Sequence, residues 1–553
     1  MADLSPVESY RRKGWWREQT FVSDLRRWAA EDPGRRALVS HFREPEAHGG
    51  PDLELTWGEL AARVDRCAGG LLELGVGRGD VVVVQLINSW QAAVTILATA
   101  RVGAVVAPVL AVAGREELEP VLRRTGARVY VVMDAFRGLP LAETAATLAR
   151  EVPTLEHVVV LGDAGRTGAL DFDRQLVDTP WEERHPPAAL DRLAPGPDDP
   201  WQLLFTSGTT GEAKGVLHSY NTLYAVARAS CEPIGLGRDD VATSPMAVTH
   251  QAGFTHGLVM PLVIGAGMVF ADTFDADDLL DLMERTGVSF VYVTPDLTRE
   301  LVDRQAERPR RLGLHTWATG SAPVASDLPG RFREVMGVRL HALWGMTENG
   351  AVTVTRPDDP DDWAALSDGR PVPWMEVRIA DEAGAEVPEG TVGRLLVRGA
   401  SQCLGFWGDE AGYAAQFDAD GWFESGDLAR SDGRGGIKIV GRARDAIRRG
   451  GQFVPVGQVE DALAGHPGVR EVALVGEPSQ AVGERICAFV AAADAQAPPT
   501  LEDLRRHLDG TGTPADWWPE RLELVGELPR NPTGKVLKRV LRERLTEARP
   551  AGR

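Results

Sequence analysis

Short runs of β-branched and other apolar residues recur along the first 300 residues, separated by longer amphipathic segments. The predicted strands are Val81–Leu86, Val105–Val109, Val129–Met133, Val158–Leu161, Met268–Phe270 and Phe290–Val293. Continuous apolar runs suit strands that are buried on both faces of a mostly parallel sheet. The intervening segments have helical periodicity, as in Leu60–Leu74, which ends at Gly75. This alternation predicts an α/β fold of layered sheets and helices.

The pattern changes beyond about Gly384, where short, turn-rich strands such as Arg394–Val397 and Ile437–Val440 are predicted. The basic, glycine-flanked run 441–451 is typical of a surface linker or a hinge. The elements predicted after it are helices at Val459–Leu463 and Leu501–Leu508, strands at Glu471–Gly476 and Ile486–Val490, and a basic C-terminal helix. A chain of 553 residues is too long for one core. We therefore predict a large N-terminal domain, residues 1–443, and a smaller α+β domain, residues 444–553.

Charge and cysteine usage narrow the classes of protein. The net charge of −20 argues against broad binding to nucleic acid or to an anionic membrane. The four cysteines are far apart and form no CxxC or Cys/His pairing, which favours reduced buried thiols over disulfides or a zinc site. The charged N-terminus does not resemble a signal peptide, and no uncharged apolar stretch reaches the ~20 residues that span a bilayer. We expect a cytoplasmic protein.

A glycine- and hydroxyl-rich stretch follows the apolar run Leu203–Phe205. Its residues are Thr206, Ser207, Gly208, Thr209, Thr210, Gly211, Glu212, Ala213, Lys214 and Gly215. Small residues let backbone N–H groups approach phosphate oxygens, hydroxyls donate further hydrogen bonds, and Lys214 adds a positive charge. The order is not that of a Walker loop, because Ala213 precedes Lys214 and Gly215 follows it. These residues alone leave a phosphate-binding loop and a flexible surface loop both open.

This stretch resembles the phosphate-binding signature of the adenylate-forming superfamily, which includes acyl-CoA synthetases, adenylation domains and luciferases. Further signatures follow in the expected order, so the resemblance covers roughly the whole chain. It implies that residues 1–443 bind ATP and the acid, while residues 444–553 form a mobile lid. The residues that it assigns to the ATP phosphates are Thr206, Ser207, Gly208, Thr209, Thr210 and Lys214.

A second stretch, Trp344-Gly345-Met346-Thr347-Glu348, resembles the aromatic-Gly-x-Thr-Glu motif of the same superfamily. The resemblance implies that this motif binds ATP through ring stacking on adenine and through Thr347 at the α-phosphate. Glu348 would be the oxygen ligand of Mg²⁺. Without this context, an exposed Thr-Glu pair would more often be a helix cap.

Two further segments resemble parts of the superfamily's substrate pocket. Gly320, Ser321 and Ala322 match the segment that lines adenine and the acyl group. His250 matches a His-x-x-Gly segment at the acyl pocket, although His256 competes for that role and a core or surface histidine is an equal alternative. The neighbourhood of Phe254, Trp317, Ala322 and Met346 is apolar, which favours a bulky alicyclic, terpenoid, aryl or medium-chain acid.

The C-terminal signatures complete the set. Ser425-Gly426-Asp427 resembles a Thr-Gly-Asp motif whose carboxylate binds ribose, and Arg442 is placed to meet ribose or phosphate. Arg444 falls at the hinge, where relatives usually carry Asp or Lys. Gly450 and Gly451 resemble the turn beside the thiol tunnel. Lys535, in a Pro-x-x-x-x-Gly-Lys loop, resembles the catalytic lysine that bridges the carboxylate and the α-phosphate; an isolated lysine there would be a surface residue.

The resemblance implies an ATP-dependent acid–thiol ligase with Mg²⁺, closest to acyl-CoA ligases such as cyclohexanecarboxylate–CoA ligase. A carboxylic acid would form acyl-AMP, and CoA would then accept the acyl group. Gln452-Phe453 and Gln458 depart from the usual residues beside the thiol tunnel, so a carrier-protein pantetheine is the alternative acceptor. A non-catalytic nucleotide-binding protein is a third class, and nothing here selects for luciferase-type oxygen chemistry. Homodimers are common among such enzymes, but the sequence carries no interface signature.

Overall fold

The computed structural model describes residues 6–45, 50–165, 167–206, 213–449, 452–479, 481–530 and 536–547. The chain folds as two compact units, one formed by Met1–Glu376 with Arg398–Phe417, the other by Val377–Val397 with Asp418–Arg553. The predicted boundary at 443/444 falls inside the second unit. That boundary marks the hinge about which the C-terminal domain is expected to move. Packing within the units does not test such a movement, so the boundary stays a prediction.

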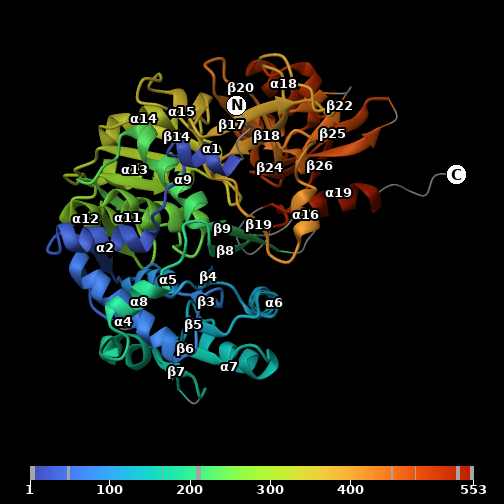
Figure 1. Cartoon of the computed structure of the whole chain (residues 1–553). Coiled ribbons are helices and arrows are strands. Elements are labelled where there is room, and N and C mark those ends of the chain that lie inside the picture. The colour runs from blue at the N-terminus through green and yellow to red at the C-terminus, as the bar shows by residue number, and fades with distance from the viewer. Residues whose placement is uncertain are drawn as a thin grey trace. The chain divides into compact units, whose positions relative to one another are not determined.

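The first unit contains two large sheets (Figure 1). Eight strands form one sheet in the order β19 (Gly405–Phe406), β9 (Lys214–Ser219), β8 (Pro200–Thr206), β4 (Val105–Pro108), β3 (Val81–Gln85), β5 (Val129–Met133), β6 (His157–Leu161) and β7 (Leu170–Asp171). Its strands from β4 to β6 are parallel, as predicted, whereas β8 and β9 are antiparallel.

The other sheet has nine strands. Their order is β16 (Arg370–Pro371), β15 (Gly350–Val354), β14 (Leu340–Met346), β13 (Thr316–Gly320), β12 (Phe290–Val293), β10 (Val241–Thr243), β11 (Gly267–Ala271), β1 (Arg36–His41) and β2 (Leu53–Thr56). All six strands predicted between residues 81 and 293, which are divided between the two sheets, are present, and their ends lie within two residues of the prediction. The parallel pairing of β10 to β14 also agrees with the buried, non-alternating runs.

Helices fill the space between and outside the sheets. Helix α5 (Trp90–Val102), which is buried all round, packs on β1, β3 and β4, and α9 (Tyr220–Cys231) packs on β9 and β15. Both helices therefore touch strands of each sheet. Helix α4 (Trp57–Glu73) begins three residues before the predicted Leu60, because Thr56 and Glu59 cap its first turn reciprocally.

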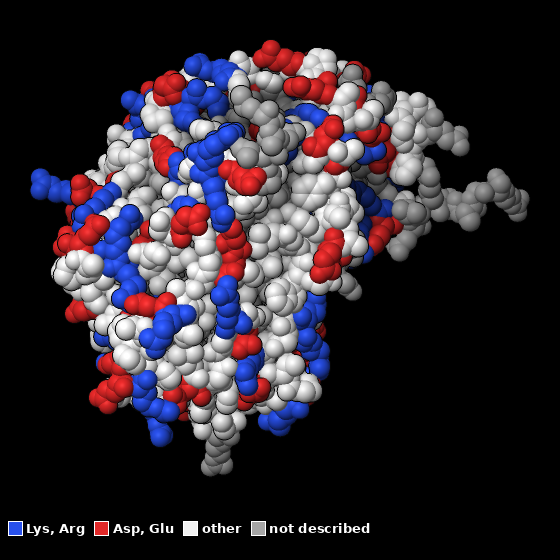
Figure 2. Space-filling view, in the orientation of Figure 1, with Lys and Arg blue, Asp and Glu red and all other residues white. Residues whose placement is uncertain are grey.

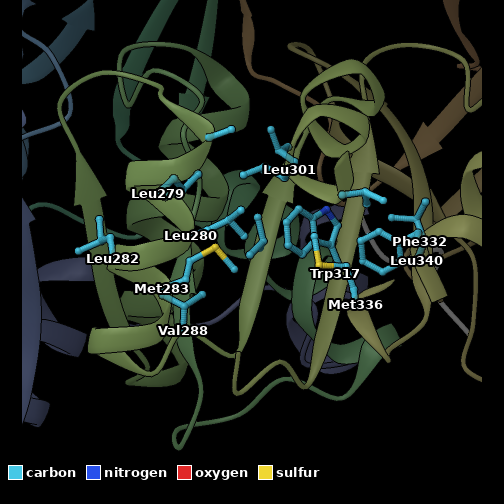
Figure 3. Packing of buried hydrophobic residues seen from close by; sticks show 14 of the residues in the cluster. Leu279, Leu280, Leu282, Met283, Val288, Leu301, Trp317, Phe332, Met336 and Leu340 are labelled. Carbon is cyan, nitrogen blue, oxygen red and sulfur yellow. The ribbon is translucent and has the colours of Figure 1, made fainter. Parts of the chain in front are cut away.

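The outer core of the nine-stranded sheet is built by three adjacent helices, α12 (Ala276–Thr286), α13 (Pro295–Glu307) and α14 (Leu328–Met336). Figure 3 shows Leu280, Met283 and Leu301 with Trp317 and Phe332 in this core. The Trp317 and Phe332 rings meet edge to face, 5.3 Å between centroids. Burying such aromatic pairs stabilises the sheet face against the helices.

The second unit has two smaller sheets. One is four-stranded, in the order β17 (Met375–Ala380), β18 (Gly393–Gly399), β20 (Phe423–Ser431) and β21 (Ile437–Arg442). The other joins β23 (Gln452–Val454), β22 (Ile447–Arg449), β25 (Gly483–Ala492) and β24 (Val469–Ser479), with β26 (Arg521–Leu524) beside β25. The run 441–451 is not wholly a linker or hinge, as the sequence had indicated, because its residues 447–449 form β22 and pair with β23 and β25.

Alternation along β24 explains how the last sheet is covered on both faces. Leu474 packs toward α17 (Val456–Ala464) and α18 (Leu501–Gly510), whereas Ala473 and Val475 pack toward α19 (Lys538–Glu547). A strand turns successive side chains to opposite faces. Charges of both signs are interspersed over the face seen in Figure 2.

Candidate nucleotide and acid site

The two ends of the predicted phosphate loop are neighbours across a strand pair. Thr206 ends β8, Lys214 begins β9, and the two are in register. The Lys214 ammonium lies 4.8 Å from the centroid of the Phe406 ring, a cation–π distance. Outside the described residues lie Ser207, Gly208, Thr209 and Thr210. Their contact with phosphate therefore stays a prediction.

An arginine that the sequence did not single out lies at the base of this loop. Arg124, near the end of α6 (Arg115–Thr125), donates to the carbonyl of Ala213, and its guanidinium carbon lies 5.3 Å from the centroid of the Phe205 ring. The indole Nε1 of Trp407 donates to the Arg124 carbonyl at 3.0 Å. An arginine in the last turn of a helix is ordinary, so the sequence carried no signal for this contact.

The Thr347–Glu348 segment forms the turn between β14 and β15. The two strands are antiparallel, with Met346 in register with Gly350. A Cβ on Gly345 would lie 2.0 Å from the Gly350 carbonyl oxygen, so the close approach of the strands requires glycine there. Thr347 and Glu348 are half-buried.

A buried histidine holds this turn from the other sheet. His218, on β9, has its Nε2 2.7 Å from the carbonyl oxygen of Thr347 and its Nδ1 2.9 Å from Oγ1 of Thr222. Burial lowers the pKa of His218 to about 4, so its ring is neutral at physiological pH. The Glu348 carbonyl accepts from the N–H of Cys403 at 2.8 Å. These contacts bring the end of the phosphate-loop hairpin and the Thr-Glu turn together.

The Gly320–Ala322 turn lies beside Trp344. Gly320 ends β13 and is in register with Leu343, the residue before Trp344. A Cβ on Gly320 would lie 2.5 Å from the Leu343 carbonyl oxygen, and Ser321 has a φ of +68°, which is unusual for serine. The Tyr292 hydroxyl lies 3.2 Å from Oγ of Ser321. The structure thus joins two motifs that are separate in the sequence.

The two candidate histidines differ sharply in exposure. His250 precedes α10 (Gln251–Gly253) and is exposed, although enough protein surrounds it for desolvation to lower its pKa. His256 is only 4% exposed, stacks on Tyr292 with 3.7 Å between ring centroids, and donates from Nδ1 to the Ala252 carbonyl. His256 is enclosed, whereas His250 reaches solvent, so His250 is the better candidate for contact with the acid.

Two apolar residues expected near the acid belong to the core instead. Phe254 and Trp317 are fully buried, with Phe254 packed on Trp201 and Trp317 on Phe332. Their neighbourhood is apolar, as expected, but the two side chains themselves belong to the core. The sequence could not separate these cases, since a core aromatic and a pocket aromatic share one pattern of neighbours.

The predicted ribose residues form an ion pair in the second unit. Asp427 and Arg442 are in register on β20 and β21, and Nε of Arg442 lies 2.9 Å from Oδ1 of Asp427. The Ser425 hydroxyl donates to the Leu395 carbonyl at 2.6 Å and accepts from the Asp427 N–H at 3.0 Å. These bonds need only a hydroxyl, so serine in place of the usual threonine keeps them.

The hinge candidate Arg444 lies in a short 3₁₀ turn, Ala443–Asp445, with its Nε 3.7 Å from the Asp445 carboxylate. Arg542 of α19 also reaches Asp445, at 3.4 Å. The remaining candidates lie outside the described residues: Gly450, Gly451 and Lys535.

The donor set suits Mg²⁺ held jointly by protein and nucleotide. Within the described ranges, no three His, Cys, Asp or Glu side chains gather as a metal cluster. Mg²⁺ in ATP-dependent sites commonly uses one or two carboxylates together with substrate phosphates. The half-buried carboxylate of Glu348, next to Thr347, fits that arrangement.

Comparison with known proteins identifies the family. The AMP-binding enzyme family matches residues 25–407, and its C-terminal domain matches residues 458–535. The chain belongs to the AMP-binding enzyme family. It has the large N-terminal part and the smaller C-terminal part of adenylate-forming enzymes, as the sequence predicted.

The relatives of this AMP-binding enzyme include two ligases that are named for aryl acids. It is 34% identical to triostin synthetase I of Streptomyces triostinicus, over 97% of this chain and 96% of that one. It is 33% identical to a salicyl-AMP ligase / salicyl-S-ArCP synthetase of Mycobacterium tuberculosis, over 96% and 92%. It is 32% identical to 2-hydroxy-7-methoxy-5-methyl-1-naphthoate–CoA ligase of Streptomyces carzinostaticus, over 96% and 94%.

A solved structure shares the fold of this AMP-binding enzyme. The anthranilate CoA ligase AuaEII in complex with anthranoyl-AMP superposes with a TM-score of 0.79 at 24% identity, over 96% of this chain and 97% of that one. Adenylate-forming enzymes use ATP and Mg²⁺. Of the helices described, none is both long and apolar enough to cross a bilayer.

Proposed function

We propose that this AMP-binding enzyme is an acyl-CoA synthetase that joins a bulky apolar carboxylic acid to CoA through an acyl-adenylate. The observation that carries this proposal is the contact between β9 and the Thr347 carbonyl. It holds the strand leaving the phosphate loop against the turn that bears Thr347 and Glu348. Nucleotide phosphates and a metal ligand are needed at one place for adenylation.

In the first half-reaction, a carboxylate oxygen of the acid attacks the α-phosphorus of ATP, and the bond to the bridging oxygen of pyrophosphate breaks. The loop from Thr206 to Lys214 holds the phosphates, and Thr347 donates to the α-phosphate. Glu348 would hold Mg²⁺, which would supply positive charge to the phosphates. Lys535 stabilises the growing charge on the phosphorus oxygens. The Gly320–Ala322 turn and Trp344 enclose adenine.

In the second half-reaction, the CoA sulfur attacks the acyl carbonyl, the thiol proton passes to solvent, and AMP leaves. Residues 444–553 would turn about Arg444 between the two steps, which withdraws Lys535 and brings Gly450 and Gly451 to a pantetheine channel. Asp427 and Arg442 would keep the ribose bound throughout. His250 would line the acid's recess.

A second candidate differs only in the acceptor. The M. tuberculosis relative is named for loading an aryl carrier protein, so a carrier-bound pantetheine is the alternative to free CoA. The naphthoate–CoA ligase, which is as similar to this chain as the M. tuberculosis relative, is named for CoA and so supports CoA as the acceptor. The side chains of Thr347, Glu348, Asp427 and Arg442 argue against a non-catalytic nucleotide-binding protein, because all four positions carry groups that the chemistry needs.

The test is acid-dependent exchange of labelled pyrophosphate into ATP across a panel of alicyclic, terpenoid, medium-chain and aryl acids, followed by CoA addition for each active acid. Exchange followed by CoA-dependent AMP release is the expected result. Exchange without a CoA product would move the assignment to the carrier-loading alternative. No exchange with any acid, from enzyme that binds AMP, would refute catalysis.

A further inference from the structure

The turn that carries Thr347 and Glu348 is held through its backbone by one strand of the other sheet. The Thr347 carbonyl accepts from His218 at 2.7 Å, and the Glu348 carbonyl accepts from Cys403 at 2.8 Å. The residue after Cys403 donates its N–H to Leu217 at 2.8 Å. Both contacts therefore lead back to two adjacent residues of β9.

The same strand begins at the phosphate loop. β9 starts at Lys214, four residues before His218, and a strand rises about 3.3 Å per residue. The link from the loop to the Thr-Glu turn is thus about 13 Å of paired strand, in register with β8 on one side and bridged to β19 on the other. A short, doubly paired strand is a rigid connection.

The His218 ring is fixed in one tautomer. Its Nε2 must carry the proton, because the Thr347 carbonyl can only accept. Nδ1 then accepts from the Thr222 hydroxyl, 2.9 Å away. The side chain is fully buried, so no water competes for either nitrogen.

We infer that His218 is a positioning residue, whose Nε2–H fixes the Thr347 carbonyl and thereby directs the Thr347 hydroxyl toward the α-phosphate. This inference rests on the proposed function only in taking the nucleotide's α-phosphate as the ligand of Thr347. Because the His218 side chain is fully buried, it acts through Thr347 and not on the substrate itself. It acts by keeping the turn at a set distance from the phosphate loop.

Binding of AMP, measured by calorimetry without metal, tests this directly. His218→Leu removes the donor, whereas His218→Gln keeps an N–H near the position of Nε2. The matched control is His341→Leu. His341 lies on β14, six residues before Thr347, and is also buried. Its Nδ1 lies 3.2 Å from the Thr355 carbonyl oxygen. We expect His218→Leu to weaken AMP binding about tenfold, and His218→Gln and His341→Leu to stay within about twofold of wild type.

Thermal unfolding separates positioning from stability. His218→Leu and His341→Leu should lose similar stability, so equal AMP affinity in these two variants would overturn the inference. A folded His218→Gln variant as weak as His218→Leu would do the same. If His218→Leu is insoluble, His218→Asn replaces it, because its shorter amide does not reach the carbonyl. Since AMP binding needs no turnover, a wild type that binds AMP but fails pyrophosphate exchange would refute the proposed function alone.

Discussion

The guanidinium of Arg442 lies against the carboxylate of Asp427, with 2.9 Å between Nε and Oδ1, where β20 and β21 run side by side. The Asp427 side chain is 4% exposed, while the Arg442 side chain is nearly half exposed. A buried carboxylate keeps its charge and direction best with a cation beside it. The pair therefore presents Asp427 in one orientation.

Replacing Arg442 by Ala is expected to raise the KM for ATP about tenfold, because the Asp427 carboxylate loses the partner that orients it. Steady-state pyrophosphate exchange at varied ATP measures this. Arg442→Lys keeps the positive charge but loses the planar guanidinium, so its KM for ATP should lie between those of wild type and Arg442→Ala. An unchanged KM in Arg442→Ala would show that the pair has no part in nucleotide binding.

Arg124 offers a test of how the base of the phosphate loop is held. Arg124→Ala is expected to raise the KM for ATP about threefold to tenfold, since the Ala213 carbonyl and the Phe205 ring lose their contact with the guanidinium. The adjacent Arg123, which donates to Glu119 on its own helix at 3.0 Å, is the matched control. Equal effects of Arg123→Ala and Arg124→Ala would point to general surface charge instead.

Lys535→Ala is expected to slow adenylate formation by about 10²-fold to 10³-fold, the usual cost of removing one group that stabilises transition-state charge. Thioester formation from a supplied acyl-adenylate should stay largely intact, because the lysine acts only in the first step. Single-turnover assays of each half-reaction measure the split. Adenylation at the wild-type rate would remove Lys535 from the mechanism.

Burial lowers the pKa of His256 to about 4, well below the value of about 6.5 of an unfolded histidine. Between these values the unfolded chain binds more protons, so stability is full above pH 6.5 and falls as the pH drops toward 4. The slope for this one residue is at most about 1.4 kcal/mol per pH unit.

His256→Phe keeps a ring against Tyr292 and removes the titration. We expect the free energy of unfolding of the variant, relative to that of wild type, to rise by about 1 kcal/mol for each pH unit below pH 6.5. Urea unfolding at pH 7 and pH 5 measures the difference. If the gap between the two proteins is the same at both values, His256 is not the titrating group.

The order of strands and helices could be read from the sequence because buried strands need continuous apolar runs and helices need a 3.6-residue period. Val129–Met133 and Phe290–Val293 have the predicted bounds. Gly345 and Gly320 could be named within their motifs, but the close backbone approaches that require glycine there came only from the structure. The pairing partners were not visible, because register depends on contacts between residues far apart in the chain.

By itself the sequence determined the chemistry on offer: which residues carry hydroxyl, carboxylate, guanidinium and ammonium groups, and in what order. Only the tertiary structure decided which of them meet and which side chains hold them. His218 and Arg124 act through backbone carbonyls, and a carbonyl leaves no mark in a sequence, since every residue has one. Burial decided the rest, because it separated the exposed His250 from the enclosed His256 and moved Phe254 and Trp317 into the core.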